Sequence, residues 1–267
     1  MENYFIVGDK FRKFSENENT ISISEFEKRI FKGQSYKIQR FYYFGQGVSY
    51  ERINRIYKKS NELKKRGIIV GIKEIDKSAK YLVHKHNSAN SMIGFPSKLS
   101  DTHYQAEVHI DDRCSELEDH VTGQHISGML LVEACRQMFL AVTEQYYLKD
   151  YDNDFYFVIK RNSAEYKKFV FPVEITIDYK VINYEVMKPG MLKFHVSMDV
   201  IQYNKICTTV EYEFVTYDQT LIAEKEAAIA KEVLKSACLM KSKAMESMNA
   251  MGVNKSVILT AREKELS

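Results

Sequence analysis

The sequence predicts an α+β fold with a largely antiparallel sheet, one long central helix, an α/β extension before them and a helix after them. Residues 126–146 are apolar on nearly every side over their first three turns, which is typical of a helix that is buried all round. Three β-rich stretches follow it, near 155–161, 172–183 and 190–217. Tyr and Phe are abundant and Trp is absent, a composition that suits long strands with aromatic cross-strand packing.

Composition narrows the class of protein. The chain has 267 residues, of which 45% are apolar and 28% charged, so wholesale disorder and a fibrous repeat are excluded. The net charge of +3 is too small for a surface that coats nucleic acid. The longest apolar stretch, around 129–135, is far shorter than the ~20 residues of a membrane helix.

Cysteine usage and the N-terminus predict the compartment. The four cysteines show neither close pairing nor C-x-x-C spacing, and the first residues lack the apolar core of a signal peptide. We therefore expect a cytoplasmic protein. We divide the chain into an extension at 1–80, a sheet-and-helix domain at 81–218 and a helical tail at 219–267.

The extension alternates short apolar and charged stretches. Residues 38–44 have the aromatic and β-branched bias of a strand that ends at Gly45. Ser49 is a candidate N-cap for a helix that ends at Gly67, with an apolar stripe of Ile53, Ile56 and Leu63. Its lysine-rich end, residues 58–66, is interpreted as a solvated face with cations at the helix C-terminus.

Strands and a second helix complete the prediction. Residues 103–110 alternate as a strand does, and a polar loop at 111–124 leads to the central helix, which Ser127 can cap. The stretch 190–217 is expected to form two strands joined by a hairpin turn at 203–205. Residues 220–250 predict a helix with a weak apolar stripe.

The most informative segment is Glu118–Gln137. It places two histidines and a glycine directly before a buried helix that carries Glu133, Arg136 and Gln137. An ionised carboxylate costs several kcal/mol to bury without a partner, so Glu133 needs an explanation. It is either a functional group or a charge that pairs with Arg136 or Gln137 on its own helix.

This segment resembles the A-factor biosynthesis (AfsA-type) hotdog family, in which a D-H loop precedes H-[VI]-x-G-M-[LV]-L-x-E-A-x-R-Q. Val83-His84-Lys85 resembles the V-H-[KR] that opens the family's domain. The resemblance spans about residues 80–220 and implies a hotdog fold, in which the sheet wraps around the central helix. The matching residues are Asp119, His120, His125, Ile126, Gly128, Met129, Leu130, Leu131, Glu133, Ala134, Arg136 and Gln137.

The same segment resembles, more distantly, the 3-hydroxyacyl-ACP dehydratases, where H-F-x-G…G-V-L-x-x-E-A-x-x-Q occupies this place. That resemblance puts His120 and Glu133 on the dehydratases' catalytic pair. Gly128 lies at the helix N-terminus, where free N–H groups can polarise a thioester carbonyl. His125 stands three residues earlier and is expected either to act in catalysis or to order the loop. A single hotdog leaves a sheet edge unpaired, which predicts a homodimer.

The first resemblance implies transfer of a β-ketoacyl group from an acyl-carrier-protein or CoA thioester to the hydroxyl of a glycerol-derived phosphate such as dihydroxyacetone phosphate. His120 or Glu133 is then the base and Gly128 the carbonyl donor. The anchor for the phosphate is expected among Arg136, Lys85 and the pair Lys160 and Arg161, with Gln137 and His84 as further substrate-binding residues. Two alternatives stay open: dehydration or hydrolysis of an acyl thioester, and a non-catalytic acyl-binding or regulatory module.

Neither a metal nor another cofactor is expected, because no His or Cys pair has metal-ligand spacing with a third partner. Gly45-Gln-Gly47 is too short for a dinucleotide fingerprint, and no G-x-S-x-G elbow occurs. We expect no nucleic-acid partner and no membrane partner.

Overall fold

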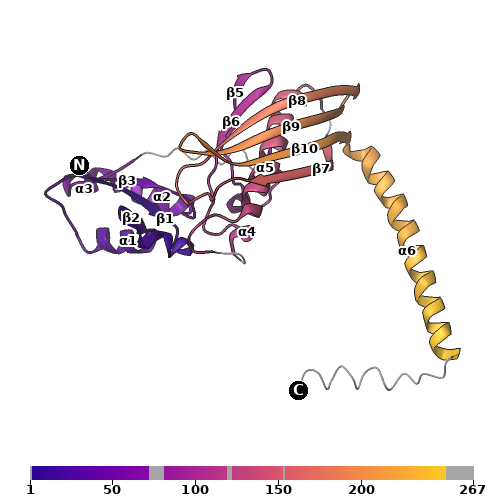
Figure 1. The fold of residues 1–267 in the computed structure, drawn as a ribbon, viewed down its shortest axis with the longest axis horizontal. Coiled ribbons are helices and arrows are strands. Elements are labelled where there is room, and N and C mark those ends of the chain that lie inside the picture. The colour runs from indigo at the N-terminus through magenta and orange to yellow at the C-terminus, as the bar shows by residue number, and fades with distance from the viewer. Residues whose placement is uncertain (1, 72–80, 119–121, 153, 251–267) are drawn as a thin grey trace. The chain divides into compact units, whose positions relative to one another are not determined.

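A computed structural model describes residues 2–71, 81–118, 122–152 and 154–250, the side chains of 248–250 excepted. The chain forms two compact units, one of residues 1–152 with 157–216 and one of residues 153–156 with 217–267. The first unit contains two sheets, a small one in the extension and a large one around the central helix (Figure 1). The extension and the domain after it thus share a compact unit.

The small sheet is parallel, with the strand order β2-β1-β3-β4. The chain moves from β1 to β2 on one side and then returns across β1 to β3 and β4 on the other. Apolar faces of three helices cover it, and their buried side chains join those of the strands in one core. Its elements are β1 (Glu2–Val7), β2 (Thr20–Ser22), α1 (Ile23–Phe31), β3 (Arg40–Phe44), α2 (Tyr50–Tyr57), α3 (Ser60–Lys65) and β4 (Ile68–Val70), with 3-10 turns at Asp9–Phe11 and Phe14–Glu16.

The helix expected between Ser49 and Gly67 is broken into α2 and α3. Ser49 is the N-cap residue of α2, as predicted, but its side chain makes no capping hydrogen bond. The break falls at Lys58 and Lys59, and it turns the chain so that Ile56 on α2 and Leu63 on α3 are both buried. The predicted apolar stripe is therefore correct, and only its continuity is wrong.

The large sheet has the order β5-β6-β8-β9-β10-β7, and the pairs from β5 to β10 are antiparallel. The hairpin between β9 and β10 turns at Tyr203 and Asn204, whose φ values of 49° and 59° suit a tight two-residue turn at the predicted place. The strands are β5 (Ser97–Ser100), β6 (His103–Glu107), β7 (Phe155–Tyr166), β8 (Thr176–Lys188), β9 (Met191–Gln202) and β10 (Lys205–Asp218).

The central helix α5 (Gly128–Val142) is buried against this sheet (Figure 1). It continues as a π-helical turn at Thr143–Tyr147, and a short helix α4 (Ser115–Glu118) and a 3-10 turn at Ser88–Asn90 precede it. Phe139 stacks on Phe214 of β10 with ring centroids 4.4 Å apart. The Tyr212 hydroxyl donates to the Val132 carbonyl at 3.2 Å. A sheet wrapped around one buried helix is the hotdog arrangement that the sequence predicted.

The second unit contains α6 (Gln219–Ala250), close to the predicted helix at 220–250. Its described side chains are exposed or half-buried, including the apolar ones of the predicted stripe. Within the part of the chain that the structure describes, no helix is both long and apolar enough to cross a membrane.

Gln46, which follows β3, ties the small sheet to the hotdog domain. Its side chain is fully buried, and its Nε2 donates to the Val108 and Val173 carbonyls, both at 3.0 Å. Its Oε1 accepts from the Ile110 N–H at 2.8 Å. Because all three partners are buried backbone groups of the hotdog domain, one side chain completes hydrogen bonds that water cannot reach.

We predict that Gln46→Ala lowers the free energy of unfolding by about 3 kcal/mol, because it leaves one buried N–H and two buried carbonyls without hydrogen-bond partners. Urea denaturation measures this change. The exposed Gln39 provides the matched control, and Gln39→Ala is expected to change stability by less than about 0.5 kcal/mol. Equal small effects of the two substitutions would contradict a structural role for Gln46.

Candidate functional site

A cavity of about 700 Å³ adjoins the N-terminus of α5. Its walls come from α4, from the loop and first turns of α5, from the end of β7 with the residues after it, and from β10. They are Glu116, His125, Ile126, Ser127, Gly128, Met129, Leu131, Tyr166, Lys167, Lys168, Phe169, Val170 and Thr208. Of the residues predicted for the site, the described structure brings only Gly128 and His125 into this wall.

Gly128 is the first residue of α5, and the cavity lies against it. The Ser127 side chain makes no capping bond, so it leaves the first N–H groups of the helix without the usual acceptor. The Tyr166 ring packs so closely that a Cβ at position 128 would lie 2.6 Å from its Cε1. Glycine at position 128 therefore allows the close approach of the Tyr166 ring, whose far end occupies the space that a Cβ would take.

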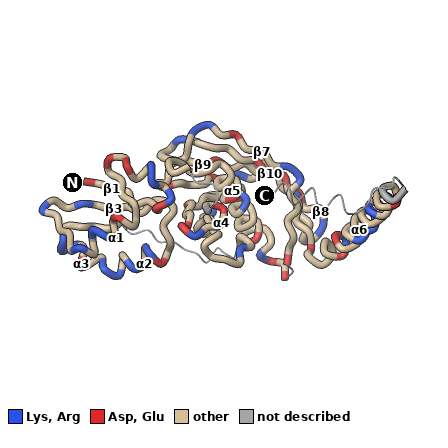
Figure 2. Tube along the Cα trace, turned by 90° about the horizontal axis from the view of Figure 1, so that it is seen from below, with Lys and Arg blue, Asp and Glu red and all other residues tan. Residues whose placement is uncertain are grey.

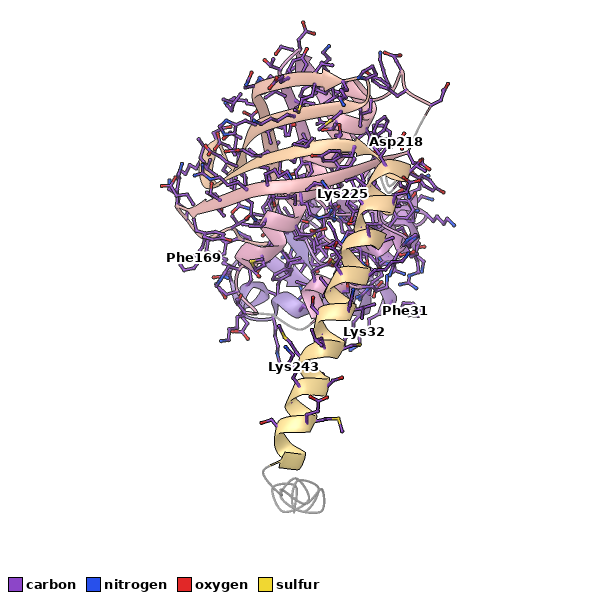
Figure 3. All side chains as sticks on the ribbon, turned by 90° about the vertical axis from the view of Figure 1, so that its right-hand side faces the viewer. Phe31, Lys32, Phe169, Asp218, Lys225 and Lys243 are labelled. Atoms are coloured by element: carbon purple, nitrogen blue, oxygen red, sulfur yellow. The ribbon has the colours of Figure 1, made fainter. Side chains whose placement is uncertain are left out.

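His125 is fixed on both sides. Its backbone N–H donates to Thr122 Oγ1 at 2.9 Å, and its carbonyl accepts from the same hydroxyl at 2.7 Å. Its ring lies 4.6 Å from that of Phe169, which is exposed at the end of the sheet (Figure 3). The loop and the aromatic neighbour together hold the imidazole at the cavity wall.

His120, the other predicted catalytic histidine, lies outside the described residues, as does Asp119. Its role stays a prediction.

Glu133 does not line the cavity and is held in a cluster of ion pairs. Arg136 donates from Nε and from a terminal nitrogen, at 2.7 and 2.9 Å, and Gln137 Nε2 donates at 3.0 Å. Lys85 Nζ lies 2.9 Å from Glu133 and 3.1 Å from Glu116. Lys85 thus bridges the helix carboxylate to one in the cavity wall.

These partners set the protonation of the cluster. Burial by itself would raise the pKa of Glu133, but hydrogen bonds from Arg136, Gln137 and Lys85 outweigh it and lower the pKa to about 2. The hydrogen bond to Glu133 raises the pKa of Arg136. Glu133 is therefore ionised and fully engaged at neutral pH, which does not suit a general base. The role of base that the sequence suggested for Glu133 stays a prediction, which these contacts do not favour.

The remaining predicted residues lie elsewhere. Gln137 is fully buried and hydrogen-bonds the Asn90 carbonyl and the Met92 N–H, so it fixes a loop. His84 Nε2 lies 3.0 Å from Glu144, near the other end of the central helix. Lys160 and Arg161 are exposed on β7, and Arg161 lies 3.6 Å from Glu213. None of these four is in the cavity wall.

Sequence reasoning missed the wall formed by residues 166–170 and Thr208. Lys168 is exposed and forms no ion pair with any described residue, and its backbone N–H donates to the Cys207 carbonyl at 2.9 Å. Thr208 is fully buried, and its hydroxyl has no hydrogen-bond partner among the described residues. The lysine pair after an aromatic residue was the only local signal, because the wrapping of β7 and β10 around α5 brings these residues to Gly128.

The described residues contain no group of three or more His, Cys, Asp or Glu side chains that could hold a metal ion. Two buried cysteines lie close to the site. Burial raises the pKa of Cys135, and burial with a hydrogen bond to Glu116 raises that of Cys114 to about 12. Both thiols are therefore protonated at neutral pH and poor nucleophiles.

A family model described as the A-factor biosynthesis hotdog domain matches residues 73–218, more than half of the chain. The chain belongs to this family. The match confirms the resemblance found in the motif around α5, begins eight residues before the predicted boundary and ends at the same residue. Membership makes the chain a hotdog protein of the acyl-thioester type.

Solved structures of low identity are similar to about half of the chain. A conserved protein from Pseudomonas aeruginosa is 16% identical, with a TM-score of 0.38, covering 52% of this chain and 99% of that one. A mutant thioesterase from the same organism is 13% identical, with a TM-score of 0.36, covering 60% and 93%. An uncharacterized protein from Pyrococcus horikoshii is 16% identical, with a TM-score of 0.32, covering 48% and 83%. No curated protein matches the sequence.

We predict that Glu133→Gln lowers the free energy of unfolding by about 3 kcal/mol at pH 7, because the pKa of Glu133 lies near 2 instead of the ordinary 4.5. A depressed carboxyl pKa stabilises the folded state above the unfolded value. The deficit of the variant should therefore be complete above pH 4.5 and shrink as the pH falls towards 2. Denaturant titrations of both proteins across this range measure it.

The control for this series is Glu18→Gln, at an exposed carboxylate without an ion pair among the described residues. It should alter stability by less than about 0.5 kcal/mol at any pH in the range. A Glu133→Gln deficit that does not change with pH would show that Glu133 is not ionised in the folded protein.

Proposed function

We propose that the cavity at the N-terminus of α5 binds a β-ketoacyl thioester of an acyl carrier protein or CoA, and that the protein transfers the acyl group to the hydroxyl of a glycerol-derived phosphate such as dihydroxyacetone phosphate. The observation that carries this proposal is the cavity of about 700 Å³ against the first turn of α5, where the Ser127 side chain makes no capping hydrogen bond. Its volume suits an acyl chain together with a small acceptor.

The thioester carbonyl is placed against the first turn of α5. The N–H groups at Gly128 and Met129 carry the positive end of the helix dipole and stabilise the oxyanion that forms as the hydroxyl attacks. Leu131 and Val170 contribute apolar wall for the acyl chain. The Thr208 hydroxyl, buried without a partner among the described residues, gains one when a polar group of the substrate enters.

His125 is assigned as the base among the described residues, since it is the only histidine of that set in the cavity wall. It takes the proton of the acceptor hydroxyl while the hydroxyl oxygen bonds to the thioester carbon. The carbon–sulfur bond then breaks, and the thiolate of the carrier accepts the proton from the imidazolium. His120 keeps its predicted catalytic role, as the second histidine of the same loop.

Lys168 is assigned as the anchor of the acceptor phosphate, in place of Arg136, Lys85, Lys160 and Arg161. It reaches the cavity and has no anionic partner among the described residues, whereas Arg136 and Lys85 are already neutralised by carboxylates. A dianionic phosphate would supply the missing counter-charge.

One observation favours a non-catalytic acyl-binding module: the carboxylate of Glu133 is closed into ion pairs, as a purely structural group would be. Such a module would bind the thioester in the same cavity and leave it unchanged.

We further propose a homodimer in which β7 pairs with a second copy. β7 is at the edge of the sheet and has twelve residues, and Ile159 and Tyr156 on it are exposed. A long edge strand with exposed apolar side chains is a template for another strand.

The transfer is tested by incubating the protein with a β-ketoacyl thioester, with and without dihydroxyacetone phosphate, and by mass spectrometry of the products. We expect the phosphate ester of the β-keto acid only when the acceptor is present. His125→Ala should lower turnover by about 100-fold, the usual scale for a lost general base. Lys168→Ala should raise the KM for the acceptor far more than that for the thioester.

His195→Ala is the matched control, because His195 is half-exposed on β9 and outside the cavity wall; it should leave turnover unchanged. Free acid as the only product would assign a thioesterase, and an α,β-unsaturated product from a 3-hydroxyacyl thioester would assign a dehydratase. Binding of the thioester without any product would assign the acyl-binding module.

We predict that the wild type sediments as a dimer at micromolar concentration and that Ile159→Asp sediments as a monomer with its fold intact, because the new charge would be buried at the paired edge. Ile182→Asp is the control, since Ile182 is also exposed but lies on β8, an interior strand of the sheet. A wild-type monomer, or dissociation by both substitutions, would contradict pairing through β7.

A further inference from the structure

The extension carries a concentrated positive charge. Residues 23–66 contain twelve Lys and Arg and only four Asp and Glu, whereas the rest of the chain has a small acidic excess. Figure 2 shows the basic residues gathered along α1, α2 and α3. We call the exposed lysines of this region the basic surface: Lys32, Lys37, Lys58, Lys59, Lys64 and Lys65.

The lysines and the arginines of the region differ in how they are used. Arg29 pairs with Glu25, Arg55 with Glu27 and Arg66 with Glu62. None of the six lysines of the basic surface forms an ion pair with a residue in the described ranges. The four acidic residues of 23–66 are thus all paired with arginines, and the six lysines have no carboxylate partner among the described residues.

An apolar groove of about 210 Å³ lies beside these charges, between α1 and α2. Ile30 and Ile56 line it, with Phe31 at 85% exposure, and Arg55 and Lys59 complete its rim. Lys59 Nζ lies 5.2 Å from the centroid of the Phe31 ring. Phe31 and Lys32 stand at the surface at the end of α1 (Figure 3). An aromatic anchor inside a charged rim is the usual composition of a protein interface.

We propose that the basic surface and this groove bind an acidic protein that carries the acyl thioester, with carboxylates on the lysines and an apolar side chain against Phe31. This step rests on the proposed function, which needs a thioester carrier. The charge of Glu27 in the groove is already paired with Arg52 and Arg55, so the groove itself suits an apolar side chain and not a phosphate of a nucleic acid or a membrane. One exposed aromatic residue also presents too little apolar area to insert into lipid.

The test compares the wild type with two variants of the full chain. One is a double variant, Lys58→Glu and Lys59→Glu together, and the other is the single variant Phe31→Ser. Binding of an acyl carrier protein loaded with a β-ketoacyl group is measured by isothermal titration. We expect the Kd to rise at least ~10-fold in each variant. Raising the salt from 0.05 to 0.3 M should weaken the wild type and affect the double lysine variant much less.

The matched control is Lys149→Glu with Lys188→Glu, at exposed lysines outside the extension, which should bind as the wild type does. Circular dichroism checks that every variant is folded. Turnover of the same acyl group on N-acetylcysteamine tests the proposed function separately, because this thioester has no protein to dock. Its KM and kcat should be equal in the wild type and the variants.

A wild type that does not bind the carrier, or variants that bind it equally well, would overturn the docking proposal whatever the turnover. Tighter binding of duplex DNA or phosphatidylglycerol vesicles, lost in the variants while carrier binding is kept, would overturn it in favour of those partners. Carrier binding that depends on the basic surface, without turnover of either thioester, would uphold docking and refute the transfer.

Discussion

The neutralisation of Glu133 is the constraint on which the structure around the site depends. Glu133 lies on the less buried side of α5, where Met129 is 71% exposed, and it stays charged because Arg136 and Lys85 reach it together. Lys85 comes from the segment before the sheet and also holds Glu116 in the cavity wall. The ion cluster therefore fixes one wall of the cavity to the helix whose N-terminus forms another.

This arrangement separates the charge that holds the site from the groups available for chemistry. The cluster already contains two cations and two carboxylates, so it has little left to offer a substrate. The cavity wall offers different groups: backbone N–H donors, an imidazole, a buried hydroxyl and a lysine that has no counter-ion among the described residues. An oxyanion is best stabilised by dipoles that are fixed in advance, and the cluster fixes the helix that supplies them.

The sequence was sufficient to predict elements with a strong hydrophobic periodicity or a distinctive local composition. The long apolar central helix and the hairpin at Tyr203 and Asn204 are local patterns. Burial of that helix on every side was wrong, since Met129 is 71% exposed, and the pairing of Glu133 with Arg136 was one of two alternatives that the sequence left open. The sequence was not sufficient to predict the cavity wall at residues 166–170, because no local sequence pattern indicates that the end of β7 lies against Gly128. The parallel order of the small sheet was likewise hidden, since short apolar runs do not specify their neighbours.

The small sheet also explains why the helices of the extension, and not its strand ends, are available to bind another molecule. In open parallel sheets, ligands bind beyond the carboxyl ends of the strands, where the strand order reverses. Here that point lies between β1 and β3, and the loops after these strands are occupied: Gln46 bonds to Val108 and Val173, and the Gly47 N–H donates to the Ile110 carbonyl. The place where such sheets usually bind a ligand is thus filled by contacts with the hotdog domain. The described part of the extension can still present its helical surface to another molecule, where six lysines have no ion-pair partner among the described residues.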